Sequence, residues 1–369
     1  MRVAIIHYWL VTMRGGEKVL RALCDMYPEA IIFTHVSNPD LVKKHFPDHE
    51  IKHTFISKLP FAQKQYRSYL PLMPMALEEL DLNGFDLVIS SESGPTKGVV
   101  ADPGARHICY CHSPMRYLWD QRHLYRREAS MPVKILAPLI SHPLRVWDVT
   151  SAARVDQFIT NSAFVAGRIK KYYRRDSTVV HPPVDTSGFA EKVDSGLISS
   201  AFRAAVDDAY ILAGQLTAYK RPDLAVDAAT KLNRRLAVIG EGEASKALKK
   251  RAGPSVHFCG RVSDAEMRYA FQNCKALLFP GEEDFGIIPI EAMAAGTPVL
   301  ALGRGGALET IQDGVTGCLF TDPSMEALIE TIETFEANTS TFCPNKIAKH
   351  AQGFSLDVFK SNFSSAISP

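Results

Sequence analysis

The chain has 369 residues, 46% of them hydrophobic, and a net charge of +2. This length can bury a large core and is too long for one ordinary domain, so two domains are expected. The near-neutral charge provides no overall field to attract nucleic acid, and no run of eighteen apolar residues predicts a membrane-spanning helix. The sequence begins with the strand-like segment Val3–Ile6 and not with a charged leader, so we expect a cytoplasmic protein.

The seven cysteines are scattered from Cys24 to Cys343, and their odd number argues against a disulfide framework. Reduced thiols are therefore expected. Cys109, Cys111 and His112 could be read as metal ligands. However, strand alternation already places both cysteines on one face, and no second pair has zinc-like spacing. Buried small side chains are the preferred interpretation.

Apolar strands alternate with helical periodicity along most of the chain, which is typical of parallel sheets covered by helices. The predicted strands are Val3–His7, Ala30–Thr34, Asp86–Ser90, His107–Cys111, Gln157–Thr160 and Thr178–Val180, followed by Tyr210–Ala213, Leu236–Ile239, Val256–Phe258, Ala276–Phe279 and Pro298–Ala301. A proline step at 181–185 is the best linker. We therefore predict α/β domains at 1–185 and 186–353, each with a doubly wound parallel sheet that binds ligands beyond the carboxyl ends of its strands.

Two segments of the first domain point to ligand binding. Gly15 and Gly16 open a predicted helix, and adjacent glycines let the backbone approach an anion or a sugar closely. A simple turn is the plainer interpretation, because the G-x-G-x-x-G pattern is absent. His112 follows a strand and could hydrogen-bond a sugar hydroxyl, although a satisfied loop histidine is more ordinary. Nearby, Arg116 could meet an anionic group.

The stretch Phe279–Leu300, FPGEEDFGIIPIEAMAAGTPVL, is the most informative about function. A helix is predicted to start near Pro289 with Ile288 as its N-cap. Isoleucine has no side-chain acceptor for the free amides of the first turn. The amides at Ile287 and Ile288, beside Gly286, are therefore expected to bind a diphosphate.

Two glutamates flank this predicted anion site. Glu283 comes from the loop and Glu291 from the expected first turn, and both can accept hydrogen bonds from sugar hydroxyls. The plainer interpretation is that Glu291 complements the helix dipole and Glu283 is solvated. A nucleotide sugar would fit, because it carries hydroxyls on both sides of its phosphates.

The whole stretch resembles the motif of the retaining GT-B glycosyltransferases of family 4, in which two glutamates separated by seven residues hold the donor. The segments at 285–287 and 296–299 add to the resemblance. It implies a GT-B fold, with two Rossmann-like domains facing each other across a cleft. It also implies that a C-terminal helix at 354–369 packs back on the first domain, which binds the acceptor, while the second domain binds the donor.

The resemblance also assigns roles to individual residues. Glu283 would position the sugar, Glu291 would bind the ribose, and His112 would orient the sugar or the acceptor. Gly15 and Gly16 would contact the donor phosphate or the acceptor. The expected donor-binding turn is completed by Phe285, Gly286, Ile287 and Ile288.

In the family an arginine and a lysine clamp the donor diphosphate. Lys220 fits this pattern, whereas Gln215 stands where relatives carry the arginine. A missing guanidinium removes one fixed cation from the leaving group, so Arg221 or another basic residue compensates, or turnover is slower. The turn with Arg261 and Val262 would lie beside the nucleobase, although a turn arginine is usually solvated.

The expected reaction is transfer of a hexose to a lipid-linked or oligosaccharide acceptor in surface polysaccharide biosynthesis, with mannose from GDP-mannose favoured. The resemblance implies front-face attack on the donor sugar, without a covalent intermediate. The chain contains no Asp-x-Asp. No obligatory metal, and no cofactor beyond the nucleotide-sugar co-substrate, is therefore expected.

Other functions stay open at this point. They are a UDP-sugar-dependent transferase, a sugar-nucleotide epimerase or hydrolase on the same fold, and a non-catalytic nucleotide-binding scaffold. Basic residues interleaved with apolar ones also allow a peripheral contact with an anionic membrane, and the alternative is that they form the solvated faces of ordinary core helices. These residues are Lys64, Arg67, Arg122, Arg126, Arg127, Lys134 and Arg145, among Leu136, Leu139, Ile140 and Trp147.

Overall fold

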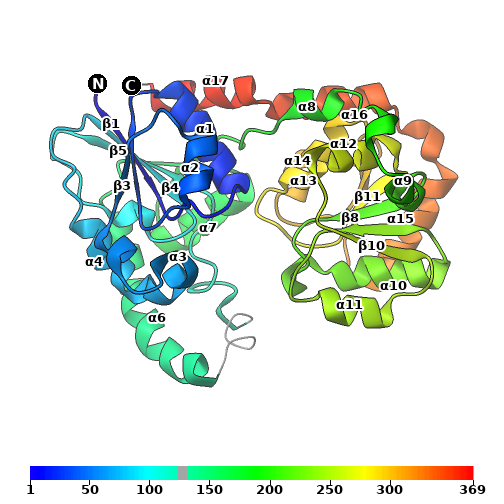
Figure 1. The fold of residues 1–369 in the computed structure, drawn as a ribbon, viewed down its shortest axis with the longest axis horizontal. Coiled ribbons are helices and arrows are strands. Elements are labelled where there is room, and N and C mark those ends of the chain that lie inside the picture. The colour runs from blue at the N-terminus through cyan, green and yellow to red at the C-terminus, as the bar shows by residue number, and fades with distance from the viewer. Residues whose placement is uncertain (124–130, 369) are drawn as a thin grey trace. The chain divides into compact units, whose positions relative to one another are not determined.

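The chain folds into two compact units, each built on one parallel sheet (Figure 1). The computed structural model describes residues 1–123 and 131–368, apart from the side chains of residues 132, 133, 135 and 136. Unit 1 comprises Met1–Pro182 and Phe359–Pro369, and unit 2 comprises Pro183–Val358.

The sheet of unit 1 has seven strands in the order β3-β2-β1-β4-β5-β6-β7. Every pairing is parallel, and β1 and β4 are buried along their whole length, as expected for strands covered on both faces. The strands are β1 (Val3–His7), β2 (Ile31–Thr34), β3 (Ile51–His53), β4 (Leu87–Glu92), β5 (Arg106–Cys111), β6 (Gln157–Thr160) and β7 (Ser177–Val179).

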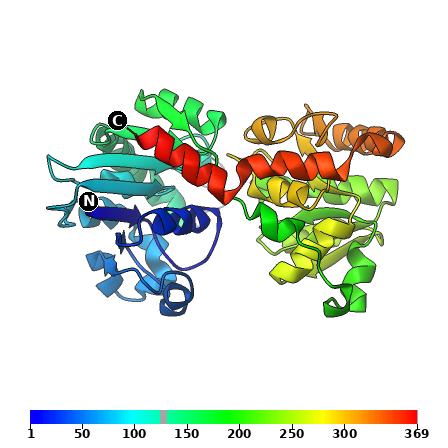
Figure 2. The ribbon, with the colours of Figure 1, turned by 90° about the horizontal axis from the view of Figure 1, so that it is seen from above.

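Helices cover both faces of this sheet. Helices α1 and α17 lie side by side over one face (Figure 2), where Lys360 and Asp25 form an ion pair at 3.6 Å. Helices α4, α6 and α7 contribute to the apolar clusters on the other face. The α-helices are α1 (Gly15–Met26), α2 (Pro39–His45), α3 (Ala62–Gln65), α4 (Met73–Glu78), α6 (Met131–Ala152), α7 (Ala163–Tyr173) and α17 (Leu356–Ile367), and the 3₁₀ turns are η1 (Phe55–Lys58), η2 (Tyr66–Leu72) and η3 (Thr96–Gly98).

The C-terminal helix α17 is anchored to the central strands of unit 1. The rings of Phe359 and Phe363 lie 5.9 and 6.4 Å from the ring of Tyr110 on β5. The side chain of Gln157 donates to the carbonyl of Ala366 at 2.8 Å. Both phenylalanines are fully buried, so hydrophobic burial fixes this end of the chain.

The sheet of unit 2 has six parallel strands in the order β10-β9-β8-β11-β12-β13. Four-residue apolar segments form its fully buried centre. The strands are β8 (Tyr210–Ala213), β9 (Leu236–Ile239), β10 (Val256–Gly260), β11 (Ala276–Phe279), β12 (Val299–Leu302) and β13 (Gly317–Phe320).

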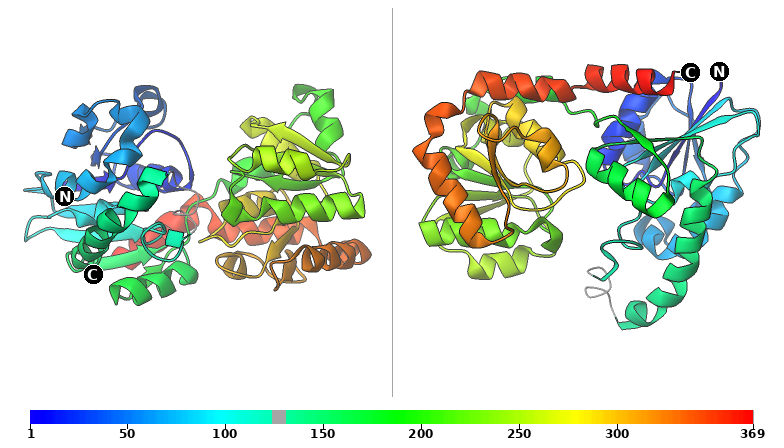
Figure 3. Two further views of the ribbon diagram at one scale, coloured as in Figure 1. Left: turned by 90° about the horizontal axis from the view of Figure 1, so that it is seen from below. Right: turned by 180° about the vertical axis from the view of Figure 1, so that it is seen from behind.

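Helices cover both faces of the second sheet as well (Figure 3). Helices α10, α11 and α15 pack on one apolar cluster, and α8, α9, α12, α13 and α16 pack on the other. The α-helices are α8 (Thr186–Ala190), α9 (Ser200–Val206), α10 (Pro222–Leu232), α11 (Ser245–Arg251), α12 (Asp264–Asn273), α13 (Ile287–Ala294), α14 (Ala307–Thr310), α15 (Met325–Ala337) and α16 (Pro344–Ala351), with 3₁₀ turns η4 (Ser195–Leu197), η5 (Ala218–Lys220), η6 (Thr339–Thr341) and η7 (Gln352–Phe354).

The predicted fold class is confirmed, and all eleven predicted strands are present with ends shifted by at most two residues. Two strands were not predicted. β3 is three residues long and carries two exposed polar side chains, Lys52 and His53. β13 begins at a glycine and is only partly buried. Both lie at sheet edges, where strands are short and their apolar pattern is weak.

Candidate functional site

The candidate donor site lies where the strand order of unit 2 reverses, between β8 and β11. Connections from these neighbouring strands leave in opposite directions, and such a switch point opens a crevice at the carboxyl ends of the strands. The loop after β8 carries Lys220, and the loop after β11 carries Glu283. The topology therefore brings together two residues that are 63 positions apart in the sequence.

Lys220 and Glu283 form an ion pair. The Lys220 ammonium lies 2.8 Å from Oε1 of Glu283, with side chains 19% and 18% exposed. A Cβ at Gly281 would lie 2.6 Å from the Cα of Lys220, so only glycine lets the two loops approach this closely. The pair is sheltered enough for its attraction to exceed that of a surface pair, and open enough for a ligand to reach it.

Helix α13 begins beside this ion pair, and its start differs from the prediction. The N-cap is Gly286, not Ile288, and Pro289 is the third helical residue. Gly286 has a φ of 89°, which glycine adopts without strain, and the helix has no side-chain cap. Proline has no N–H, so the first-turn amides belong to Ile287 and Ile288, as expected for an anion-binding helix end.

Gly214, at the end of β8, brings the ion pair and the helix start together. A Cβ at this position would lie 2.9 Å from Cδ1 of Ile288 and 3.7 Å from the ammonium of Lys220. The side chain of Ile288, in the first turn of α13, and the Lys220 ammonium therefore both lie next to Gly214, which brings the positive end of the helix dipole close to the lysine charge. Both favour a negatively charged group such as a diphosphate.

The loop that carries Glu283 is held by the next connection along the sheet. Gly306 donates its amide to the carbonyl of Glu283 at 2.9 Å, and a side chain at Gly305 would overlap that carbonyl. Phe285 is buried and meets the ring of Phe354 edge-on at 5.9 Å. Phe285 therefore anchors the loop in the core, while Glu283 stays at the surface.

Glu291 is the fifth residue of α13, so it lies in the second turn and not in the first. It is 8% exposed and has interactions of its own. A buried carboxylate needs hydrogen-bond partners, and the plainer interpretation, that Glu291 only complements the helix dipole, accounts for none of them. Its assignment to the ribose stays a prediction.

The structure does not bring Arg221 to the ion pair. The guanidinium of Arg221 bonds the carboxylate of Asp223 at 3.0 Å and the carbonyl of Pro323 at 3.3 Å. Gln215 is exposed. Lys220 is therefore the cation that the described residues place at the start of α13.

The predicted base-contact turn lies after β10. Arg261 pairs with Glu241 at 3.0 Å, but its side chain is 85% exposed. Val262 is partly buried against the apolar core of unit 2. The structure adds no contact that favours a nucleobase there, and both assignments stay predictions.

In unit 1, the predicted residues His112 and Gly16 lie together at the corresponding switch point, between β1 and β4. Nε2 of His112 is 2.9 Å from Oγ of Ser91 on β4. A Cβ at Gly16 would overlap the hydroxyl of Tyr8 and lie 3.6 Å from Nε2 of His112. Gly15 is the first residue of α1. The glycine pair therefore lets α1 start directly against the histidine.

Sequence reasoning missed three residues behind His112. They are Ser91, His7 and Glu17, and their side chains form a buried polar row that continues from His112. Two sequence patterns could have indicated them: a polar residue at the end of an apolar strand, and an acidic residue at the third position of a helix. His7 and Glu17 show these patterns.

Two family patterns match most of the chain. The family described as Glycosyltransferase Family 4 matches residues 13–187, and the one described as Glycosyl transferases group 1 matches residues 201–352. The chain belongs to the GT-B glycosyltransferases of family 4. The segment 13–187 contains Gly15, Gly16 and His112, and the segment 201–352 contains Lys220, Glu283 and Glu291.

Similar proteins, at modest identity, are named as glycosyltransferases or mannosyltransferases. The D-inositol 3-phosphate glycosyltransferase of Streptomyces scabiei is 30% identical over 55% of this chain and 51% of its own. The alpha-1,3/1,6-mannosyltransferase ALG2 of Mus musculus is 25% identical over 79% of this chain and 76% of its own. The chain spans about half the length of the first curated relatives it matches.

Solved structures share the fold of the chain. HepE of Anabaena, solved with UDP-glucose, superposes with a TM-score of 0.73 at 18% identity, over 99% of both chains. At this identity the likeness concerns the fold, which is the GT-B pair of Rossmann-like units.

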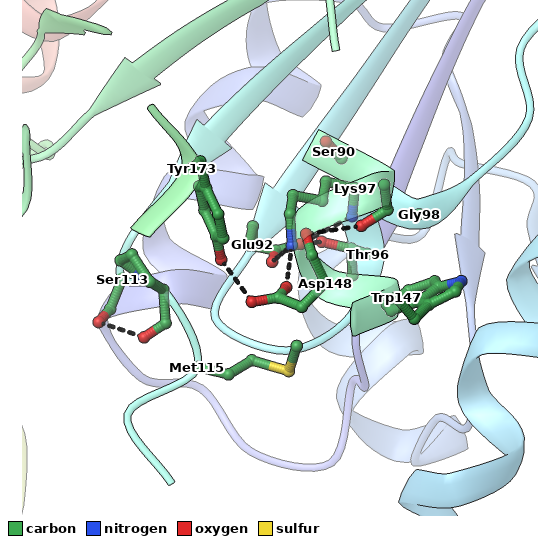
Figure 4. Close-up of polar contacts among 12 residues, drawn as sticks. Ser90, Glu92, Thr96, Lys97, Gly98, Ser113, Met115, Trp147, Asp148 and Tyr173 are labelled. Atoms are coloured by element: carbon green, nitrogen blue, oxygen red, sulfur yellow. Dashed lines mark hydrogen bonds and ion pairs between the residues drawn. The ribbon is translucent and has the colours of Figure 1, made fainter. Parts of the chain in front are cut away.

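This family 4 chain also contains a buried ionic cluster under the end of β4 (Figure 4). The ammonium of Lys97 bonds Glu92 at 3.0 Å and also contacts Asp148, and all three side chains are fully buried. Burial alone would lower the pKa of Lys97, but the charges of Asp148 and Glu92 raise it above its usual value. Asp148 also accepts from Tyr173 at 3.0 Å and from Trp119 at 2.8 Å.

The same cluster helps to position the segment after His112. Trp119 ties this segment to Asp148, and the guanidinium of Arg168 bonds Ser113 at 3.0 Å and Asp120 at 2.6 Å. The segment that follows His112 is thus held by two charged residues of the helices beneath it. No motif in the sequence indicated this arrangement.

A hollow of about 670 Å³ lies elsewhere in unit 2, at the amino ends of β8, β11 and β12. It is lined by Asp208, Lys275 and Pro298, which lie one or two residues before these strands. It is therefore at the opposite edge of the sheet from Lys220 and Glu283. Ligands of doubly wound sheets bind at the carboxyl edge, so this hollow is not the candidate donor site.

Proposed function

We propose that this chain is a retaining glycosyltransferase that transfers a hexose from a nucleotide sugar to a lipid-linked or oligosaccharide acceptor. One observation carries the proposal. Lys220, Glu283 and the uncapped start of α13 meet at the switch point of unit 2, in a chain of this family. Nucleotide sugars are among the few ligands that need a cation, helix amides and an acceptor for hydroxyl groups within one small region.

The main chemical requirement is to stabilise the departing nucleoside diphosphate. The ammonium of Lys220 and the amides of Ile287 and Ile288 would donate to its phosphates as charge develops there. Glu283 would accept hydrogen bonds from the sugar hydroxyls. Glu291 would bind the ribose, and His112 would orient the sugar or the acceptor for front-face attack.

GDP-mannose is the favoured donor. Several relatives are named alpha-1,3/1,6-mannosyltransferase, which supports mannose. A UDP-sugar is the second candidate, because a structural neighbour was solved with UDP-glucose and another is named a lipopolysaccharide galactosyltransferase. The latter name also supports a surface polysaccharide as the destination of the sugar.

A lipid-linked acceptor would fit a peripheral contact of unit 1 with an anionic membrane. Phe61 is 73% exposed and Met75 50% exposed, and the basic Lys64 and Arg67 lie between them in the sequence. Of the predicted basic and apolar residues, Arg126, Arg127 and the Leu136 side chain lie outside the described residues. No helix in the described part of the chain is long and apolar enough to cross a membrane.

A thermal-shift panel with GDP, UDP, ADP and their sugars tests the donor. We expect stabilisation by one nucleoside diphosphate and its sugar, with GDP favoured, and a lower affinity for that nucleotide in Glu291→Ala. His112→Ala is expected to keep the nucleotide affinity and to lose transfer. Equal nucleotide affinity in Glu291→Ala and in the unmodified protein would refute the ribose assignment.

Two other classes of function make different predictions in the same experiment. A sugar-nucleotide hydrolase or epimerase would release UDP or interconvert sugars without any acceptor. A nucleotide-binding scaffold, which Gln215 makes conceivable, would bind nucleotide but support no turnover with any acceptor extract. Addition of EDTA completes the assay, since the proposal expects transfer to continue without an added metal.

A further inference from the structure

The side chains behind His112 form a row because of the strand register in unit 1. His7 on β1 is in register with Ser91 on β4, and Ser91 is in register with Tyr110 on β5. Residues in register on parallel strands share a face, and alternation places His112 on the face of Tyr110. Helix α1 covers this face and contributes Glu17.

The row is continuous at the atomic level. Nε2 of His112 is 2.9 Å from Oγ of Ser91, and Oγ of Ser91 is 3.1 Å from Nδ1 of His7. Nε2 of His7 has no hydrogen-bond partner and lies 3.8 Å from Oε1 of Glu17. Glu17, His7 and Ser91 are buried, and only His112 is partly exposed.

Glu17 is placed to act as an anion. Its other carboxylate oxygen accepts the backbone N–H of Arg14 at 2.9 Å, in a capping box at the start of α1. The positive end of the helix dipole attracts negative charge there. A carboxylate accepts hydrogen bonds and cannot donate them, so Nε2 of His7 is stabilised only if it carries a proton towards Glu17.

The proton on Nε2 of His7 decides which atom donates and which accepts in every hydrogen bond of the row. With its proton on Nε2, His7 accepts from the Ser91 hydroxyl through Nδ1, and Ser91 in turn accepts from Nε2–H of His112. The reverse direction would bury the lone pair of His7 Nε2 against a carboxylate 3.8 Å away. We infer that Glu17, through His7 and Ser91, fixes His112 as the Nε2–H tautomer and leaves its Nδ1 as a hydrogen-bond acceptor.

A fixed tautomer matters only for a neutral imidazole, and His112 meets this condition. Burial, with a contribution from His7, lowers the pKa of His112 to about 3. At neutral pH the ring therefore carries one N–H and one lone pair. If His112 acts in transfer as proposed above, Nδ1 accepts a hydrogen bond from a hydroxyl of the sugar or the acceptor, and Glu17, His7 and Ser91 are positioning residues.

Glu17→Gln tests the inference, because glutamine can satisfy both neighbours. Its carbonyl oxygen can keep the bond from the Arg14 amide, and its NH₂ group can donate to Nε2 of His7. That donation reverses the row and moves the proton of His112 to Nδ1. We expect nitrogen NMR of the histidine-labelled protein, assigned with His112→Asn and His7→Gln, to report Nε2–H in the unmodified protein and Nδ1–H in Glu17→Gln.

Kinetics and controls separate this role from a structural one. We expect Glu17→Gln to lower kcat roughly 10- to 100-fold at an unchanged nucleotide affinity, as typical for positioning residues behind a functional histidine. In Ser91→Ala the row is broken, so adding Glu17→Gln should then change neither kcat nor the His112 tautomer. Glu266→Gln removes the matching charge in the capping box of α12 and should leave the tautomer unchanged.

An unprotonated Nε2 on His112 in the unmodified protein would overturn the inference. So would an unchanged His112 tautomer in folded Glu17→Gln. If the tautomer reverses but kcat does not fall, the inference stands, and the role of His112 in the proposed function fails instead.

Discussion

The ion pair between Lys220 and Glu283 predicts opposite effects for its two partners on nucleotide binding. At 2.8 Å the two charges attract each other by about 6 kcal/mol at an effective dielectric constant of about 20. A diphosphate that binds the Lys220 ammonium therefore competes with Glu283 for it. Neutralising each partner in turn separates the two roles.

Lys220→Met removes a charge-assisted hydrogen bond to the diphosphate. Such a bond contributes about 1.5–3 kcal/mol, so the dissociation constant for the nucleoside diphosphate should rise roughly 10- to 150-fold. Glu283→Gln keeps the shape but releases the ammonium. Nucleotide affinity should stay constant or increase by up to about fivefold, or about 1 kcal/mol, while transfer falls at least about tenfold because the sugar hydroxyls lose a charged acceptor.

Isothermal titration calorimetry with the nucleoside diphosphate measures both constants directly. Lys275→Met is the matched control, because Lys275 pairs with Asp208 at 3.6 Å at the other edge of the same sheet. It should leave the affinity unchanged. If Lys220→Met and Glu283→Gln weakened binding equally, the pair would be a structural unit, and the ammonium would not be the partner of the diphosphate.

Three further predictions concern the scaffold. Gly286→Ala should lower the free energy of unfolding by about 1–2 kcal/mol in urea titrations, because alanine is strained at a φ of 89° and its Cβ would lie 3.3 Å from the ring of Phe279. Lys97→Met leaves two buried carboxylates without their cation and should cost about 3–5 kcal/mol, whereas Lys170→Met, in an exposed pair, should have no measurable effect in the same titration. Burial lowers the pKa of His35 to about 4, below its unfolded value of 6.5. The unfolded chain therefore takes up a proton at this histidine at a higher pH than the folded protein does, and the fold loses stability as the pH falls from 6.5 towards 4. Unfolding at pH 5 should therefore be easier than at pH 6.5 by about 1.6 kcal/mol for this histidine, and His35→Gln should reduce that pH dependence.

The sequence predicted the central strands and the donor loop because their signals are local. Apolar four-residue strands such as Ala276–Phe279, and the glycine and proline residues after them, fix a strand, a turn and a helix within twenty residues. The start of α13 was misplaced by two residues because Pro289 was read as a first helical residue. Gly286 accepts the left-handed cap conformation and moves the helix start upstream.

The partners of the predicted residues could not be read from the sequence. Glu283 was predicted to position the sugar, but its pairing with Lys220 depends on two loops that only the strand order brings together. The same holds for the row behind His112. His7, Ser91 and His112 become neighbours through the register of three strands, and no local pattern encodes that register.

The proposed function requires that a nucleoside diphosphate binds at the start of α13. Backbone amide NMR of the protein titrated with GDP or UDP tests it most directly. We expect the largest shift changes at the amides of Gly286, Ile287 and Ile288, and we expect these changes to be lost in Lys220→Met. Changes confined to residues around the hollow near Asp208 and Lys275, with the α13 amides unmoved, would contradict it.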